Sequence, residues 1–300
     1  MKHLFYPFFN PVNLIQAYRF HKNTGRYDRT VNDLELKLYS KILKNDMLHY
    51  GYFDDINTDP EFISIALLEK AQKRYAEIIE EQILEKSLPV LDVGCGMGGL
   101  SNFLLSKGIN VEALTPDRNQ IAYIERLDHG LVCHHSRFEK FVSAKKFGTV
   151  INSESIQYLN LDAAFRNVDQ IISPGGRWII TDVFRIGEKS SNKSGHRIGD
   201  LLIKIKEHGW KIAYERDITQ HVLPTLKLLC MYVDRYLVPL SQYAEEKFTY
   251  KKAWVFYLTK NIREAIAEKC RKEILAIKPE VFLEEKRYML YVLQKDMSIG

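Results

Sequence analysis

Two hydrophobic patterns alternate along the chain from residue 88 onward. Short apolar runs predict buried strands, and stretches with apolar residues three and four positions apart predict amphipathic helices. Strands are predicted at residues 89–93, 109–114, 131–134, 147–152, 177–184, 210–214 and 286–294, and helices at residues 100–107, 118–127, 161–172 and 197–208. This alternation is typical of an α/β fold, so we expect a seven-stranded, mostly parallel, Rossmann-like sheet with helices on both faces.

The first 87 residues carry a helical pattern instead. One helix is expected from Asn32 or Asp33 to Leu43, and a second from Pro60, capped by Thr58 or Asp59, to about Lys86. Residues 1–22 are aromatic but are interrupted by prolines and asparagines, and they lack the continuous apolar centre of a signal peptide. We expect this segment to pack on the body of the protein or on a partner subunit, with part of a lid or a membrane-surface contact as the alternative.

A helical insertion is predicted between the last two strands. The chain is therefore divided into an N-terminal helical cap (1–87), a cofactor-binding core (88–217), a helical lid or insertion (218–285) and a final core strand (286–300). The insertion is rich in leucine and aromatic residues, which suits a cover over an apolar substrate, a lid core or a dimer interface. Its basic residues, Lys251, Lys252, Lys260 and Arg263, are expected on a solvated helix face.

Composition and charge narrow the class of protein. The chain has 300 residues and a net charge of +5, with basic and acidic residues interleaved rather than gathered in one basic module. We therefore expect no nucleic-acid partner. The four cysteines show no metal-like spacing, which favours reduced thiols in a cytoplasmic protein, and no apolar run reaches the length of a membrane span.

The most specific motif is VLDVGCGMGGL at residues 90–100. A buried strand leads through Asp92 into Gly94 and Gly96, and a helix follows. Glycines allow a ligand to lie against the backbone, and the first turn of a helix offers N–H groups. This string resembles the glycine-rich signature of class I S-adenosylmethionine-dependent methyltransferases. The resemblance continues in INSESIQYL (151–159) and SPGGRWIITD (173–182). It implies that Asp92, Gly94 and Gly96 line the site for the methionine part of the cofactor.

A second resemblance points to a subgroup. Tyr27-Asp28, Asn32-Asp33 and HYGYF at residues 49–53 resemble the region before the cofactor loop in cyclopropane-fatty-acid synthases and in sterol and tocopherol C-methyltransferases. In those proteins the region folds over the cofactor, which implies that Tyr27 and the aromatic residues around Tyr50 wall the site. The alternative is that they are core aromatics of a helical cap.

The ribose and adenine contacts follow from the same resemblance. Thr115 stands where many class I enzymes have an acidic residue, and it resembles the threonine of the cyclopropane-synthase group. Thr115 and Gln120 are therefore the ribose candidates, with Asp117 as a competing assignment that N-capping also explains. Ser136 is the adenine candidate, and Phe138 is a candidate for stacking on the ring.

The acceptor side is expected around the end of the fourth strand. Glu154 suits either a base or a group that stabilises a developing cation, and a helix cap or an ion pair is the plainer alternative. Asn152 is a further cofactor-side candidate, and Tyr158 and His49 are further catalytic candidates. Gln157-Tyr158 replaces the Glu-His that the resemblance implies for cyclopropane synthases, which favours methylation over methylene transfer.

These observations predict transfer of a methyl group from S-adenosylmethionine to a small, lipophilic molecule, with carbon favoured and oxygen or nitrogen left open. The alternatives are methylene transfer to lipid and a non-methylating cyclase or binding protein that keeps the cofactor pocket. No metal is expected, because His134, His135, His208 and His221 show no ligand spacing. Assembly into a homo-oligomer is left open.

Overall fold

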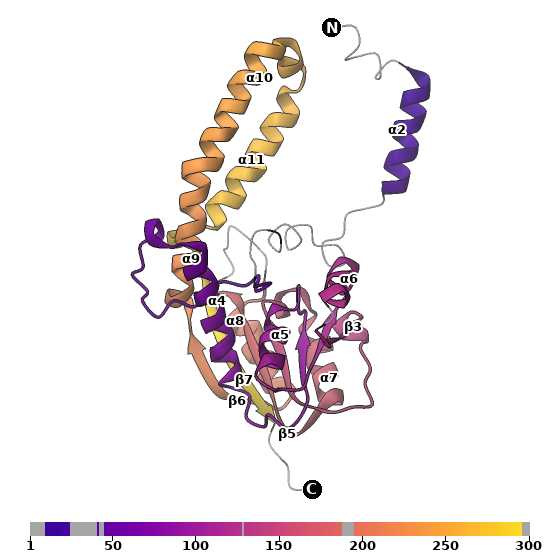
Figure 1. Ribbon diagram of the computed structural model, residues 1–300, viewed down its shortest axis with the longest axis vertical. Coiled ribbons are helices and arrows are strands. Elements are labelled where there is room, and N and C mark those ends of the chain that lie inside the picture. The colour runs from indigo at the N-terminus through magenta and orange to yellow at the C-terminus, as the bar shows by residue number, and fades with distance from the viewer. Residues whose placement is uncertain (1–9, 25–40, 42–44, 128, 188–194, 296–300) are drawn as a thin grey trace.

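A computed structural model describes residues 10–24, 41, 45–127, 129–187 and 195–295. Tyr27 and, apart from Lys41, the helix predicted up to Leu43 lie outside these residues. The described chain forms a central sheet with helices on both sides and two helical projections at one end (Figure 1).

Seven strands form one sheet in the order β3-β2-β1-β4-β5-β7-β6, and only β7 runs antiparallel to its neighbours. The strands are β1 (Val90–Val93), β2 (Val111–Thr115), β3 (Val132–His135), β4 (Phe147–Ser153), β5 (Ile172–Arg185), β6 (Trp210–Asp217) and β7 (Lys286–Lys295). The predicted seven-stranded, mostly parallel sheet is confirmed.

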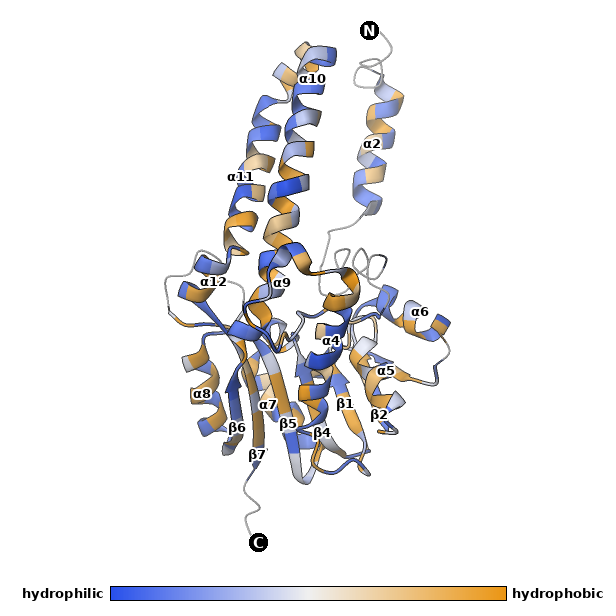
Figure 2. Cartoon of the chain, turned by 60° about the vertical axis from the view of Figure 1, so that its left-hand side comes forward, coloured by the Kyte–Doolittle hydropathy of each residue, from blue (hydrophilic) through white to orange (hydrophobic). Residues whose placement is uncertain are grey.

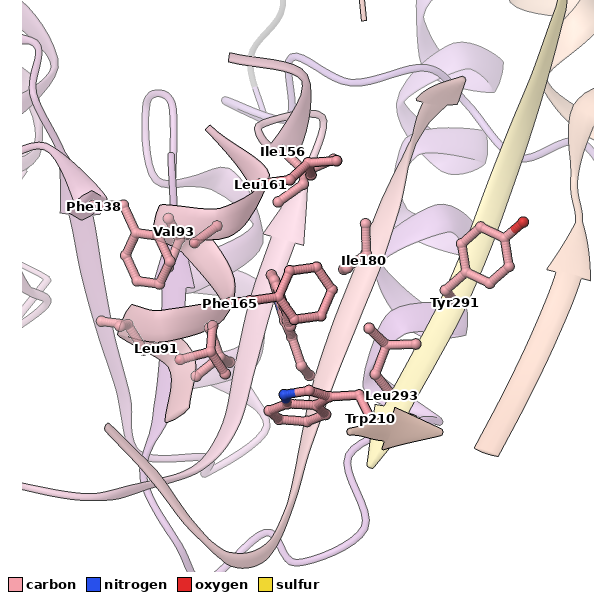
Figure 3. Close-up of a cluster of buried hydrophobic side chains, with 14 of the residues drawn as sticks. Leu91, Val93, Phe138, Ile156, Leu161, Phe165, Ile180, Trp210, Tyr291 and Leu293 are labelled. Carbon is pink, nitrogen blue, oxygen red and sulfur yellow. The ribbon is translucent and has the colours of Figure 1, made fainter. Parts of the chain in front are cut away.

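Alternate residues of each strand face opposite layers of helices. On one face, Leu91, Trp178 and Leu293 pack against α7 (Leu161–Ile171) and α8 (Ile198–Glu207). Figure 3 shows Phe165 of α7 at the centre of this cluster. On the other face, strand residues such as Tyr288 pack against α4 (Ile65–Glu80), α5 (Gly99–Ser106) and the start of α9 (Thr219–Tyr232), with α6 (Arg118–Leu127) beside them.

Three boundaries differ clearly from the sequence prediction, namely the start and end of the helix predicted from Pro60 and the start of β5. Pro60 begins only a single 3₁₀ turn, η1 (Pro60–Phe62), because Ile63 then adopts an extended conformation and is buried. Ser64 caps α4, which ends at Glu80 rather than near Lys86. The strand β5 begins at Ile172, so the Pro174-Gly175-Gly176 turn lies within it as an irregularity in the pairing with β4.

A helical segment stands between β6 and β7, as predicted. It comprises α9, the π-helical turn η4 (Val233–Leu237), α10 (Val238–Leu258), α11 (Lys260–Ala276) and α12 (Pro279–Glu285). Only α9, the first residue of η4 and Phe282 of α12 contribute buried side chains, whereas α10 and α11 contribute none and form a hairpin that projects from the body (Figure 1). The apolar residues of α10 therefore do not cover the sheet as a lid would.

The N-terminal helix α2 (Pro11–Thr24) also has no buried residue. Residues 11–24 therefore do not pack on the body of this chain, and the other predictions for this segment, a partner subunit, a lid or a membrane-surface contact, stay predictions. No helix of the described residues is long and apolar enough to cross a bilayer.

Removal of the Phe165 ring tests the α7 layer. Phe165 is fully buried and lies edge-on to Trp178 with ring centroids 4.8 Å apart. Phe165→Ala is expected to lower the free energy of unfolding by about 3–5 kcal/mol, measured by denaturant titration. Phe62→Ala is the matched control, because Phe62 is 79% exposed and its loss is expected to cost about 0.5 kcal/mol or less. Equal losses in the two variants would contradict this packing.

Candidate functional site

The glycine-rich loop leaves open space beside its backbone at the carboxyl end of β1. Gly94 has a φ of +76°, and a Cβ there would lie 2.5 Å from the Ser155 Cβ, so this residue must be glycine. Gly96 has a φ of +57°, and no heavy atom of the protein lies within 4 Å of its Cβ position. A ligand can therefore approach the backbone closely at Gly96, as the sequence motif predicts.

Asp92 is buried beneath this loop. Its carboxylate accepts a hydrogen bond of 2.6 Å from the Ser101 hydroxyl on α5, and burial raises its pKa to about 6. Asp92 thus fastens β1 to the helix that follows the loop. With 1% of its surface exposed, it supports the loop from below.

The two ribose candidates meet at the end of β2. The Thr115 hydroxyl donates to the Gln120 amide oxygen at 2.5 Å. Asp117 instead accepts from the backbone N–H groups of Asn119 and Gln120 at the start of α6, so the capping interpretation of Asp117 holds. Gly94 N–H donates to the Leu114 carbonyl at 2.8 Å, which keeps the Thr115 pair next to the glycine loop.

The two adenine candidates, Ser136 and Phe138, lie in different environments. Ser136 N–H donates to the Thr115 carbonyl at 3.1 Å, which places Ser136 beside the ribose candidates. Phe138 is only 2% exposed and belongs to the core cluster on the α7 face. The expectation that Phe138 stacks on a ligand is therefore wrong, because its ring is already packed among core side chains.

Asn152 also has a different place from the expected one. It is fully buried on β4, its amide oxygen accepts from the Trp178 indole N–H at 2.8 Å, and its amide nitrogen donates to Ser155 at 2.8 Å. The Ser155 hydroxyl in turn donates to the Val93 carbonyl at 2.5 Å. Asn152 therefore positions the turn after β4 against the glycine loop instead of presenting its amide to a ligand.

Glu154 is the centre of a hydrogen-bond chain on the acceptor side. Its backbone has a φ of +52°, a conformation that is rare for residues other than glycine. Its carboxylate accepts from the Tyr288 hydroxyl at 2.5 Å and from the Tyr50 N–H at 3.0 Å. The Tyr288 and Tyr75 hydroxyls are 3.0 Å apart, and Tyr75 is 3.1 Å from the Ser153 hydroxyl.

Proton positions in this chain follow from the chemistry of its members. Tyr288 has one hydroxyl proton and an ionised carboxylate only accepts, so when Glu154 is ionised the Tyr288 proton points to Glu154 and Tyr75 donates to the Tyr288 oxygen. Burial raises the pKa of Glu154, while the bonds from Tyr288 and Tyr50 oppose that rise. Burial, together with the negative charge of Glu154, raises the pKa of neighbouring Asp182 to about 8.

His49 lies against this chain. Its ring stacks on Tyr75 with centroids 4.1 Å apart, and its Nδ1 is 2.9 Å from the Tyr50 carbonyl. A carbonyl only accepts, so Nδ1 carries the proton and Nε2 is left as an acceptor. Nε2 is buried and has no hydrogen-bond partner among the described residues, and burial lowers the His49 pKa to about 4.

Tyr158 does not join the acceptor-side chain. It lies in the 3₁₀ turn η3 (Ile156–Tyr158) and is 55% exposed. The hydroxyl that reaches Glu154 is that of Tyr288 on β7, and Tyr75 of α4 contacts the Tyr288 hydroxyl; the sequence analysis missed both tyrosines. Both tyrosines stand in apolar patterns with helix or strand spacing, so each position is typical of an ordinary core residue. The only available signal was that the hydroxyl of a buried tyrosine usually has a hydrogen-bond partner.

No group of three or more His, Cys, Asp or Glu residues within the described ranges is arranged to hold a metal ion. The donor set near Gly96, Thr115 and Gln120 consists of backbone, hydroxyl and amide groups. These groups suit a ligand that carries a carboxylate, an amino group and a ribose, and the space at Gly96 suits its close approach to the backbone.

Sequence relatives are methyltransferases. An uncharacterized methyltransferase of Bacillus cytotoxicus is 27% identical over 124 residues, which cover 40% of this chain and 58% of that protein. The ubiquinone biosynthesis O-methyltransferase of Rickettsia typhi is 28% identical over 65% of this chain and 76% of that protein. The chloroplastic tocopherol O-methyltransferase of Arabidopsis thaliana is 28% identical over 45% of this chain and 43% of that protein. The chain thus spans less than two thirds of the first and third of these relatives.

Solved structures share the fold at low identity. Geranyl diphosphate C-methyltransferase from Streptomyces coelicolor has a TM-score of 0.62 at 16% identity, with 87% of this chain and 93% of that chain covered. The cyclopropane synthase MmaA2 from Mycobacterium tuberculosis has a TM-score of 0.61 at 13% identity, over 84% and 91%. The (4+2)-cyclase SpnF has a TM-score of 0.60 at 16% identity, over 89% and 97%.

A family model described as a methyltransferase domain matches residues 67–235, which is more than half of the chain and includes the glycine loop, the ribose candidates and Glu154. The chain therefore belongs to the methyltransferase domain family, whose cofactor is S-adenosylmethionine.

Proposed function

We propose that this protein transfers a methyl group from S-adenosylmethionine to a small, largely apolar acceptor, with carbon as the favoured acceptor atom. The observation that carries the proposal is the buried Glu154 chain, which places one carboxylate among the rings of Tyr50, Tyr75 and Tyr288. A carbon acceptor loses a proton or passes through a cation, and a partly desolvated carboxylate serves both needs.

The cofactor residues that this proposal uses are those around the open space at Gly96. The backbone at Gly94 and Gly96 holds the methionine end, Thr115 and Gln120 meet the ribose hydroxyls, and Ser136 lies toward the adenine. Bound there, the cofactor supplies an electrophilic methyl group. Tyr27 is proposed to wall the same site, although it lies outside the described residues.

The acceptor side is assigned to Glu154, His49 and their partners. With the cofactor bound, its methyl group would be available to the acceptor's electron pair, with the electron pair of the broken carbon–sulfur bond left on sulfur, and Glu154 would take the proton that a carbon acceptor loses. The Tyr288 hydroxyl and Tyr50 N–H hold that carboxylate in place. Nε2 of His49 is a buried acceptor suited to a hydroxyl on the substrate.

The fate of the methyl hydrogens tests the reaction type. The purified protein is incubated with S-adenosylmethionine carrying a fully deuterated methyl group and a metabolite and lipid extract, and products are examined by mass spectrometry. We expect a product that keeps every methyl deuterium. A product that has lost one deuterium would show methylene transfer or later cyclisation. An unlabelled, rearranged product formed only with the cofactor bound would show a non-methylating cyclase.

The hydroxyl of Tyr288 tests the role of Glu154. Tyr288→Phe removes a hydrogen bond that lowers the Glu154 pKa, so that pKa rises further. A base must be ionised, so activity grows as pH rises through its pKa, and the acidic limb of the rate profile is expected to move to higher pH in this variant. Glu154→Gln is expected to lower kcat by about 10²–10⁴-fold.

Tyr291→Phe is the matched control. Tyr291 is a buried tyrosine of the same strand β7, but it faces the opposite side of the sheet, in the cluster of Figure 3. It loses the same atom, and its pH profile is expected to match that of the unmodified protein. A profile that is unchanged in Tyr288→Phe, or shifted equally in both variants, would refute the assignment.

A further inference from the structure

The α10–α11 hairpin projects from the body of the described chain. Its two helices, Val238–Leu258 and Lys260–Ala276, bury no side chain. Figures 1 and 2 show it rising away from the sheet, on the same end of the molecule as α2. It begins at the functional edge, because α9 starts where β6 ends and β6 runs parallel to β1 through β5.

The end of the hairpin, residues 250–260, is a formed structure and is called the tip below. The helix is broken at Lys252, which has φ −143° and ψ 46°, and the chain turns there. The tip is held by Phe256, whose ring lies under the Arg263 guanidinium at 3.3 Å and edge-on to Phe248. Arg263 also pairs with Glu245 at 2.7 Å.

The outer surface of the tip is aromatic, apolar and basic. Tyr250 is 88% exposed, Tyr257 76% and Leu258 67%. The tip also contains Trp254 and three lysines, Lys251, Lys252 and Lys260, and no acidic residue. Tyrosine and tryptophan with an apolar body and a polar edge, flanked by lysines, suit the boundary between lipid headgroups and acyl chains.

The net positive charge of the protein is concentrated in the two projections. The hairpin, residues 238–276, has eight Lys and Arg against five Asp and Glu, and α2 has two basic and no acidic residues. The rest of the chain therefore has 33 residues of each sign, out of totals of 43 and 38. The whole excess of +5 stands on the segments that bury nothing.

An exposed apolar surface suits either a second copy of the chain or a lipid bilayer. The positive charge distinguishes between these two partners. In a symmetric dimer the same patch meets itself, so two positive projections would repel each other. An anionic surface attracts them, and each lysine near such a surface adds to binding. We propose that the tip, residues 250–260, docks the protein on a bilayer that contains anionic phospholipid.

Docking there would bring the acceptor side toward lipid. The helix α9 leads through η4 into the hairpin, and its Thr225 hydroxyl accepts from the Gly51 N–H at 3.0 Å, beside His49 and Tyr50. A lipophilic acceptor dissolved in the bilayer would then lie on the side of the molecule from which the hairpin rises. The docking itself does not rest on the proposed reaction, and binding is measured without substrate.

Trp254 gives a built-in readout of this contact. The chain has three tryptophans, of which Trp178 is fully buried, Trp210 is 3% exposed and Trp254 is 37% exposed. The full-length protein is titrated with vesicles of phosphatidylcholine and phosphatidylglycerol in equal parts, and separately with pure phosphatidylcholine vesicles. We expect a blue shift of Trp254 emission and cosedimentation with the anionic vesicles only, weakened by added salt.

Two variants locate the contact. Lys251→Glu with Lys252→Glu is expected to weaken partitioning by at least about thirtyfold, since each basic residue near an anionic surface contributes about 1 kcal/mol. Tyr257→Ser with Leu258→Ser is expected to abolish the emission shift by removing the inserted side chains.

Lys269→Glu with Lys272→Glu is the matched control on the same hairpin. It makes the same change in net charge at two residues that lie, on average, about 16 Å along α11 from Lys260, the last residue of the tip. This distance exceeds the screening length of about 8 Å at physiological salt. It is expected to keep most of the binding, and circular dichroism confirms that each variant is folded.

Three results would overturn the proposal: no binding to anionic vesicles, equal binding to neutral vesicles, or an equal loss in the tip and control variants. A dimer in vesicle-free solution, detected by light scattering and dissociated by the tip variants, would assign the surface to a second copy instead.

Discussion

The hydrogen bonds on the Glu154 carboxylate are the constraint on which the functional edge depends. They join β4, which carries Glu154, to Tyr288 on β7 and to Tyr50 in the segment before α4. Tyr75 of α4 completes the chain through Tyr288. Four segments far apart in the sequence are thus fixed around one partly desolvated carboxylate. The backbone of Glu154 is in the left-handed region, and its N–H donates to the Thr181 carbonyl at 2.8 Å, which holds it there.

The cofactor side and the acceptor side are linked by the turn after β4. Ser155 touches the space above Gly94 and donates to the Val93 carbonyl, while Asn152 holds Ser155 from beneath. A side chain larger than hydrogen at Gly94 would displace this turn and with it Glu154. The glycine motif therefore serves two purposes, because Gly94 allows the two sides to approach and Gly96 leaves room for the ligand.

The sequence predicted the fold well because its signals were local. Short apolar runs placed the strands close to their observed bounds, except that β5 begins at Ile172 rather than at residue 177, and α6 was predicted with the bounds that it has. The Thr115–Gln120 pair was found because both residues lie near the end of one strand. The Tyr288–Glu154 contact was missed because it joins residues 134 positions apart, and nothing local marks Tyr288 as different from its core neighbours. The predicted lid or insertion, residues 218–285, was found as a helical segment, but its apolar residues alone did not indicate that α10 and α11 would project from the body, because an apolar stripe does not specify the surface on which it packs.

Binding of S-adenosylhomocysteine to Gly96→Ala tests the central claim, that the open space beside Gly96 receives the cofactor. Gly108→Ala is the matched control, because Gly108 also has a positive φ, of 77°, and no heavy atom within 4 Å of its Cβ position, but it lies at the other end of α5. Both variants bear a similar backbone cost of about 1 kcal/mol. By isothermal titration calorimetry, Gly96→Ala is expected to bind S-adenosylhomocysteine at least about tenfold more weakly than Gly108→Ala does. The reason is that only the substitution at Gly96 places a methyl group in the space that receives the ligand. Equal affinity in the two variants would place the cofactor elsewhere and contradict the account.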